Sequence, residues 1–79
     1  MNKKYDLEYK KIGLNIAYYR KLKGLTQLQL AELANLSRTH ISYIEGTGTN
    51  TSLSLESLFA IADALEIPAY KLLVFPTEE

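Results

Sequence analysis

Two short helical patterns separated by a short break constrain this chain more than any of its other features. Residues 27–44 read QLQLAELANLSRTHISYI, and the break runs from Asn35 to Arg38. The small residue Ala31 lies where two helices could cross closely. Apolar residues recur at helical spacing on both sides of the break, at Leu30, Ala34, Leu36, Ile41 and Ile44. The first helix can therefore hold the second against a core and leave one face of the second uncovered.

That uncovered face carries side chains suited to DNA. Arg38 could form a forked pair of hydrogen bonds to a guanine, and Thr39 could contact a thymine methyl group. Ser42 or Tyr43 could reach a base edge or a phosphate. The alternative is an ordinary solvated helix face. The pattern predicts a helix-turn-helix over residues 26–45, whose second helix enters a DNA groove.

The helical period recurs along the rest of the chain, and no alternation of strand length accompanies it. Gly24 is typical of a helix end, Thr26 and Gln29 can form a capping box, and Pro68 suits the first turn of a short last helix. We expect an all-α fold, a compact five-helix bundle in a single domain 1–79. Its core covers residues 10–74, its flexible tail residues 75–79, and its helices about residues 5–23, 26–34, 37–45, 54–65 and 68–73.

Apolar spacing also predicts which side chains are buried. The first helix should bury one stripe formed by Tyr5, Tyr9, Ile12, Ile16 and Tyr19. The fourth should bury Leu55, Leu58, Phe59, Ala62 and Leu65. The first helix carries a second apolar stripe almost opposite the first, at Leu7, Leu14, Tyr18 and Leu22. A partner could cover this second stripe, or the tail could cover part of it.

Composition excludes several classes of protein. The chain has no cysteine and one histidine, so we expect no metal site, no cofactor and a cytoplasmic location. No apolar run is long enough to span a membrane. An enzyme is not expected, because no nucleophilic side chain is paired with His40 as its general base. No glycine-rich phosphate loop occurs either. The net charge is zero, but the charges are unevenly distributed along the chain. Residues 1–25 carry seven basic and two acidic residues, whereas the remainder carries two basic and seven acidic residues.

In combination, these motifs make the chain similar to the Cro/C1-type (Xre) helix-turn-helix family, over roughly residues 10–74. The matching residues are Ile12-Gly13, Ile16, Arg20, Gly24-Leu25-Thr26-Gln27, Leu30-Ala31, Leu36-Ser37-Arg38, Ile41-Ser42, Ile44-Glu45, Ser57-Leu58 and Ile61-Ala62-Asp63-Ala64-Leu65. The resemblance implies a lambda-repressor-like fold and sequence-specific binding to double-stranded DNA in transcriptional regulation. The chain departs from the family at Asn35, where a glycine is usual, and at Gly46, where a basic residue is frequent.

The resemblance also implies roles for single residues. Gln27 would grip the sugar-phosphate backbone, at a helix start where backbone amides favour a phosphate. We group Thr26 and His40 with it as possible DNA contacts, although packing beside the core is the preferred interpretation for His40. Arg20 and Glu45 match a family ion pair that fixes the recognition helix. The loop that follows could bind phosphates through Thr47, Thr49, Asn50 and Thr51, or could be only a connection.

The carboxyl-terminal end carries more apolar residues than a short helix must bury. The family often dimerises through this end, so the resemblance implies a homodimer contact through Tyr70, Leu73, Val74 and Phe75. The favoured function is a transcriptional regulator, more often a repressor, on an inverted-repeat operator. The alternative is an antitoxin-like or adaptor module that binds a protein partner through Leu14, Tyr18 and Leu22. The sequence names neither the operator nor the regulated genes.

Overall fold

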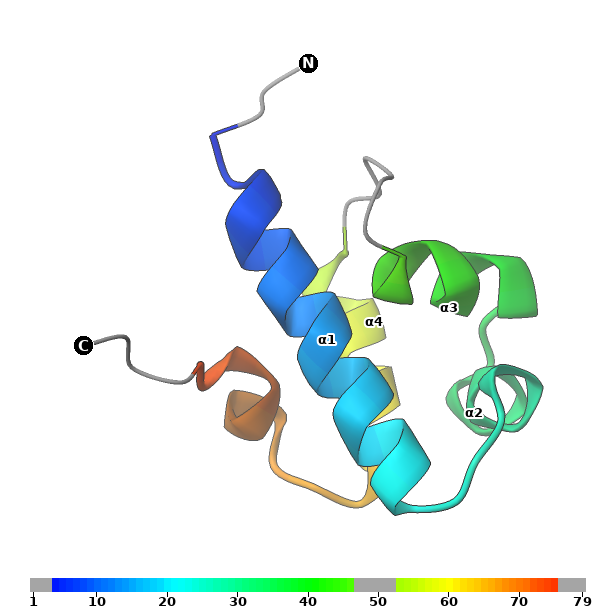
Figure 1. Ribbon diagram of the computed structural model, residues 1–79. Helices are drawn as coiled ribbons and strands as arrows, with labels where there is room; N and C mark the ends of the chain where they lie inside the picture. Colours follow the sequence, from blue (N-terminus) through cyan, green and yellow to red (C-terminus); the bar gives the residue numbers. More distant parts are fainter. Residues whose placement is uncertain (1–3, 47–52, 76–79) are drawn as a thin grey trace.

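Every regular element within the residues that the structure describes is a helix (Figure 1). The computed structural model describes residues 4–46 and 53–75. The elements are α1 (Asp6–Leu22), α2 (Gln27–Ala34), α3 (Arg38–Glu45), α4 (Leu55–Leu65) and a 3-10 helix, η1 (Ala69–Leu73). The all-α expectation and the helix-turn-helix at α2 and α3 are therefore confirmed.

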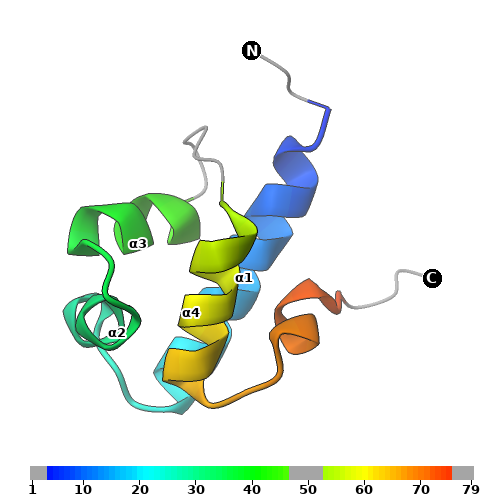
Figure 2. The same ribbon diagram turned by 180° about the vertical axis from the view of Figure 1, so that it is seen from behind.

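The helices α1 and α4 form the middle of the molecule. The helices α2 and α3 lie on one side of them, and η1 lies on the other (Figures 1 and 2). The long helix α1 packs against α3, α4 and η1, whereas α2 packs against α3 and α4. The helix α4 also packs against η1, so both α1 and α4 contact the helix-turn-helix and the carboxyl-terminal end of the chain.

Local signals in the sequence set the helix boundaries. Gly24 follows α1 with a positive φ of 78°, a conformation that glycine adopts without strain. Thr26 and Gln29 form the expected capping box at the start of α2. Asn35 ends α2 in the left-handed region, with φ 58°. Ser37 and Ser54 cap α3 and α4 through their hydroxyl oxygens.

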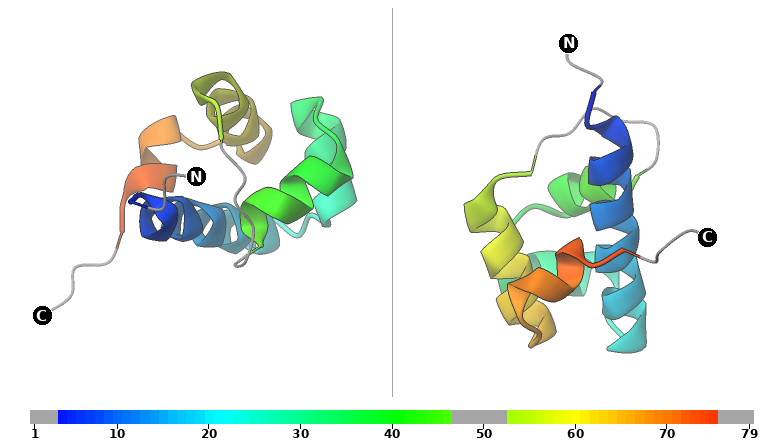
Figure 3. Two further views of the ribbon diagram at one scale, coloured as in Figure 1. Left: turned by 90° about the horizontal axis from the view of Figure 1, so that it is seen from above. Right: turned by 90° about the vertical axis from the view of Figure 1, so that its left-hand side faces the viewer.

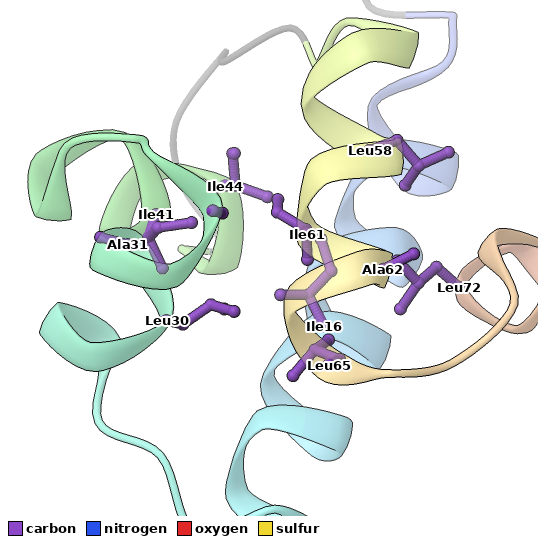
Figure 4. Packing of buried hydrophobic residues seen from close by; sticks show 11 residues of the cluster. Ile16, Leu30, Ala31, Ile41, Ile44, Leu58, Ile61, Ala62, Leu65 and Leu72 are labelled. Atoms are coloured by element: carbon purple, nitrogen blue, oxygen red, sulfur yellow. The ribbon is translucent and has the colours of Figure 1, made fainter.

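One hydrophobic core joins all five elements. Each contributes one large side chain that is fully buried: Ile16, Leu30, Ile41, Ile61 and Leu72. Ala31, Ala62 and Leu65 pack around them (Figure 4). The small side chain of Ala31 is 1% exposed, as expected for a position where two helices cross closely. The core therefore holds α3 by its inner face.

The expected buried stripe of α1 is wrong for its first two residues. Ile16 is fully buried, and Ile12 and Tyr19 pack against the core, but Tyr5 and Tyr9 are 51% and 43% exposed. The first turns of α1 project beyond the rest of the bundle (Figure 1). Tyr5 and Tyr9 instead line an open groove of about 450 Å³, together with Ile12, Leu53, Leu55 and Leu73 among others.

The expected buried face of α4 is wrong at two positions. Leu55 and Phe59 are 67% and 53% exposed, whereas Ile61 is fully buried. One residue turns a helix by about 100°, so Phe59 lies well away from the direction of the buried Leu58. Spacing alone could not distinguish the two faces, because α4 carries apolar residues around most of its circumference.

The last element is a 3-10 helix rather than the expected fifth α-helix. Pro68 precedes it as the N-cap, with an extended backbone (ψ 143°), and the helix contains only Ala69–Leu73. A 3-10 turn is a common form for so short a segment. Leu72 still anchors the end of the chain, because its side chain is fully buried.

Candidate nucleic-acid interface

The recognition helix α3 separates its buried and exposed residues cleanly. Ile41 and Ile44 face the core, whereas Arg38, Thr39 and Tyr43 are exposed and Ser42 is half-buried. The hydroxyl oxygen of Ser37 accepts a hydrogen bond from the backbone N–H of His40 at 3.0 Å. Arg38 and Thr39 therefore stand on the exposed first turn of a capped helix. The helix α3 lies on the side of the molecule away from η1 (Figure 3).

The turn between α2 and α3 is held by backbone hydrogen bonds. Asn35 adopts the left-handed conformation, and the N–H of Leu36 donates to the carbonyl of Ala31 at 2.9 Å. Asparagine tolerates this conformation better than most residues with a side chain. The glycine that is frequent here in the family is therefore dispensable for the turn.

Glu45, at the end of α3, accepts hydrogen bonds from two other helices. The guanidinium of Arg20 donates from Nε to Oε2 at 2.7 Å and from Nη2 to Oε1 at 3.0 Å. The amide Nε2 of Gln27 donates to Oε1 at 3.0 Å. The side chains of Arg20 and Glu45 are only 10% and 6% exposed. We call these three residues the Glu45 network.

The Glu45 network joins α1, α2 and α3 at one point. Arg20 Nη1 also donates to the carbonyl of Leu25 at 2.8 Å, which ties the connection between α1 and α2 to the same group. Charge-assisted forked bonds of this kind fix direction as well as distance. The end of the recognition helix is therefore held from two sides.

Gln27, for which a phosphate contact is expected, also has a partner within the protein. It stands at the start of α2 and is half-buried, with its amide group directed to Glu45. No local pattern indicates this contact, because the two residues are eighteen positions apart in the chain. Thr26 is exposed, and its side chain caps α2.

Gly13 is a second position whose role sequence reasoning missed. It is buried in the middle of α1, against the backbone of Ile44 and Glu45 on α3. A Cβ atom at this position would collide with the carbonyl oxygen of Ile44 and lie 3.4 Å from the Cα of Glu45. A lone glycine inside a helical pattern was the available signal. Its absent side chain lets α1 and α3 approach closely.

The remaining expected contacts are His40 and residues that follow α3 in the chain. His40 is half-buried on the recognition helix. Thr47, Thr49, Asn50 and Thr51 lie outside the described residues.

The carboxyl-terminal surface is formed by Tyr70, Leu73, Val74 and Phe75, on the side of α1 away from α3 (Figure 3). The first three are exposed, and Phe75 is half-buried beneath the ammonium of Lys11, which lies 5.5 Å from the ring centre. The amide Nδ2 of Asn15 donates to the carbonyls of Leu72 at 2.9 Å and Val74 at 3.0 Å. This surface is therefore attached to α1 and leaves its large apolar side chains exposed.

The second apolar stripe of α1 is exposed at each of its positions, Leu7, Leu14, Tyr18 and Leu22. The tail that could cover part of it lies, beyond Phe75, outside the described residues. No helix in the described ranges is long and apolar enough to cross a membrane. Residues 4–46 and 53–75 contain no group of three or more side chains that could hold a metal ion.

Comparison with known proteins places this arrangement in a family. A family model described as helix-turn-helix matches residues 16–72, which is more than half of the chain. The immunity repressor protein of Bacillus phage phi105 is 50% identical over 56 residues, which cover 71% of this chain. The chain spans only 38% of that repressor's length.

Solved structures agree with the sequence match. The restriction-modification controller protein C.AhdI from Aeromonas hydrophila is 32% identical with a TM-score of 0.76, covering 84% of this chain and 97% of the other. C.Esp1396I bound to a 19-base-pair DNA duplex is 38% identical with a TM-score of 0.71, covering 81% and 83%. The protein therefore belongs to the helix-turn-helix family, of the Cro/C1 type.

Proposed function

We propose that this protein is a transcriptional regulator that acts as a repressor. It would bind an inverted-repeat operator as a homodimer. The observation that supports this most strongly is the exposed first turn of α3, where Arg38 and Thr39 stand on a helix held by Ile41 and Ile44. Relatives that are named as an immunity repressor and as restriction-modification controllers favour the same role. A protein of this kind acts where the DNA is, and we therefore place it in the cytoplasm.

Each exposed residue of α3 has a proposed contact. Arg38 donates two hydrogen bonds to a guanine, and Thr39 contacts a thymine methyl group. Ser42 and Tyr43 follow on the same face and reach a base edge or a phosphate. Gln27 orients α3 through its hydrogen bond to Glu45, and the second N–H of the same amide group donates to a phosphate of the DNA backbone. We propose no catalytic role and no cofactor.

The dimer contact is assigned to the carboxyl-terminal surface. Three of its four large side chains are exposed, and they form part of an apolar area that continues into the groove beside Leu73. A two-fold contact here would place two recognition helices about 34 Å apart, one turn of DNA. The operator would then have the same two-fold symmetry.

Selection of bound sequences from random duplexes tests this function. We expect an inverted repeat whose half-sites are centred about one helical turn apart. The Arg38→Ala variant should lose preference at one base pair of each half-site. Recovery of no common sequence, or of a single site without symmetry from a dimeric protein, would contradict the proposal.

A second function, a protein-interaction module, draws on one separate observation. Leu14, Tyr18 and Leu22 form an exposed apolar line on α1, and the chain has no net positive charge. A stoichiometric protein partner, together with the absence of DNA binding by the isolated chain, would favour this reading over an operator-binding dimer.

A further inference from the structure

The carboxyl-terminal surface has little secondary structure of its own. The helix η1 contains five residues, and beyond it Val74 has an extended backbone with φ −93° and ψ 120°. Inside the bundle the segment is anchored by Leu72, whose side chain is fully buried. Lys11 lies over the ring of Phe75, and a further attachment is made of hydrogen bonds, because Asn15 donates to the carbonyls of both Leu72 and Val74. A side-chain amide carries two N–H donors, so one group can hold both carbonyls.

Asn15 lies on the opposite side of α1 from the contacts with the recognition helix. Gly13 is two positions before it and Arg20 five positions after it. At 3.6 residues per turn these positions are about 160° and about 140° away around the helix axis. Gly13 meets the backbone of Ile44, and Arg20 meets the carboxylate of Glu45. One helix therefore holds α3 on one side and the carboxyl-terminal surface on the other.

We propose that Asn15 is a positioning residue that sets the separation of the two recognition helices in the dimer. The inference rests on the proposed homodimer through the carboxyl-terminal surface. In a two-fold dimer, the path from one α3 to the other passes through α1, Asn15 and the segment 72–75, then through the same parts of the second copy. The amide of Asn15 is the hydrogen-bonded junction in this path. The length of this path sets the distance between the two recognition helices, and therefore the half-site spacing that the dimer binds.

Loss of the Asn15 hydrogen bonds should make the separation of the two recognition helices less fixed. It should not change α3 itself or the burial of Leu72. Leu72 would keep the chain end in the core, whereas Val74 and Phe75 would change position relative to α1. The dimer would weaken, and operators with altered spacing would be bound almost as well as the natural one. Binding of one subunit to a single half-site would be unchanged, since Arg38, Thr39 and the Glu45 network lie on the other side of α1.

The test uses Asn15→Ala and Asn15→Asp in the full chain. Asn15→Asp keeps the shape but replaces the donor group with a carboxylate that faces two carbonyl oxygens. Lys10→Ala is the control, because it shortens another exposed polar side chain of α1. For each protein, sedimentation gives the dimer dissociation constant. Gel-shift titration gives the affinities for the selected operator, for operators with one base pair inserted or removed between half-sites, and for a single half-site. Thermal unfolding shows whether each variant is folded.

We expect dimerisation and spacing discrimination each to fall about tenfold in Asn15→Ala, as for the loss of two ordinary hydrogen bonds, and further in Asn15→Asp. Half-site affinity should match the wild type, and Lys10→Ala should retain the discrimination. Unchanged dimerisation and discrimination in a folded Asn15→Ala would overturn the inference. If the wild type is a monomer or shows no preferred spacing, the proposed dimer itself is wrong. If Asn15→Asp does not fold, Asn15→Ala decides alone.

Discussion

The guanidinium of Arg20 on α1 forms a forked pair of hydrogen bonds, at 2.7 and 3.0 Å, with the carboxylate of Glu45 at the end of α3. Both side chains are almost fully buried. The pair therefore acts inside the protein, where it joins α1 to α3, the proposed DNA-binding helix. Gln27 adds a third helix to the same carboxylate.

Removal of one partner should destabilise the fold. Arg20→Ala leaves a buried carboxylate without its positive partner, which costs roughly 3–5 kcal/mol. Urea unfolding monitored by circular dichroism measures this loss. Glu45→Gln is the milder variant, because it keeps the shape and one oxygen acceptor, and it should lower both the melting temperature and the operator affinity. Wild-type stability in Arg20→Ala would contradict a structural role for the pair.

Gly13→Ala should separate α1 from α3. The new methyl group would collide with the Ile44 carbonyl oxygen, which is backbone and cannot rotate away. Overpacking of this kind costs about 1–3 kcal/mol, partly offset by the better helix propensity of alanine. Urea unfolding should therefore show a net loss of stability, with weaker operator binding. Lys21→Ala, at an exposed position on the same helix, is the control and should lose neither. Equal stability of both variants would show that the close approach is not required.

Arg38→Ala should reduce sequence preference without reducing stability. The side chain is exposed, so the free energy of unfolding should change by no more than about 0.5 kcal/mol. Loss of a forked contact to guanine should cost about 1–3 kcal/mol of discrimination at one base pair. Arg38→Lys keeps the charge but not the fork, so it should retain non-specific affinity and lose the preference. An unchanged base preference in competition gel shifts would remove Arg38 from the readout.

Gln27→Glu tests the third arm of the Glu45 network. It replaces the amide donor with a carboxylate beside the Glu45 carboxylate, so like charges meet where a hydrogen bond was. We expect a lower melting temperature and weaker operator binding, whereas Gln27→Ala should lose less stability. The comparison is made by thermal unfolding at neutral pH. Equal melting temperatures of the wild type and Gln27→Glu would show that the contact is not energetically important.

The Lys23 and Glu66 pair predicts a weak pH dependence. Lys23 Nζ donates to Glu66 Oε1 at 2.5 Å, and this hydrogen bond and the positive charge lower the pKa of Glu66 below its ordinary value. The stabilisation is complete above the ordinary pKa and is lost as the pH falls through the lowered one. The melting-temperature difference between the wild type and Glu66→Gln should therefore shrink from about pH 6 to about pH 3. A melting-temperature difference between the wild type and Glu66→Gln that grows as the pH falls would contradict the lowered pKa of Glu66.

The sequence by itself determined the helices and their ends. Thr26, Ser37 and Gly24 act on backbone groups a few residues away, so their effect is readable without a fold. The spacing of Ile41 and Ile44 likewise fixed which face of α3 is buried, because the opposite face is polar. The exposure of Arg38 and Thr39 followed from the same pattern.

Only the tertiary structure decided which helices meet and at which residues. The approach of Gly13 to Ile44, the hydrogen bond from Gln27 to Glu45 and the attachment of Val74 to Asn15 join residues far apart in the chain. Phe59 was misplaced for the same reason, since both faces of α4 are apolar and only its neighbours select the buried one. Periodicity gives each helix its faces, but packing between helices depends on their relative positions, which no local pattern contains.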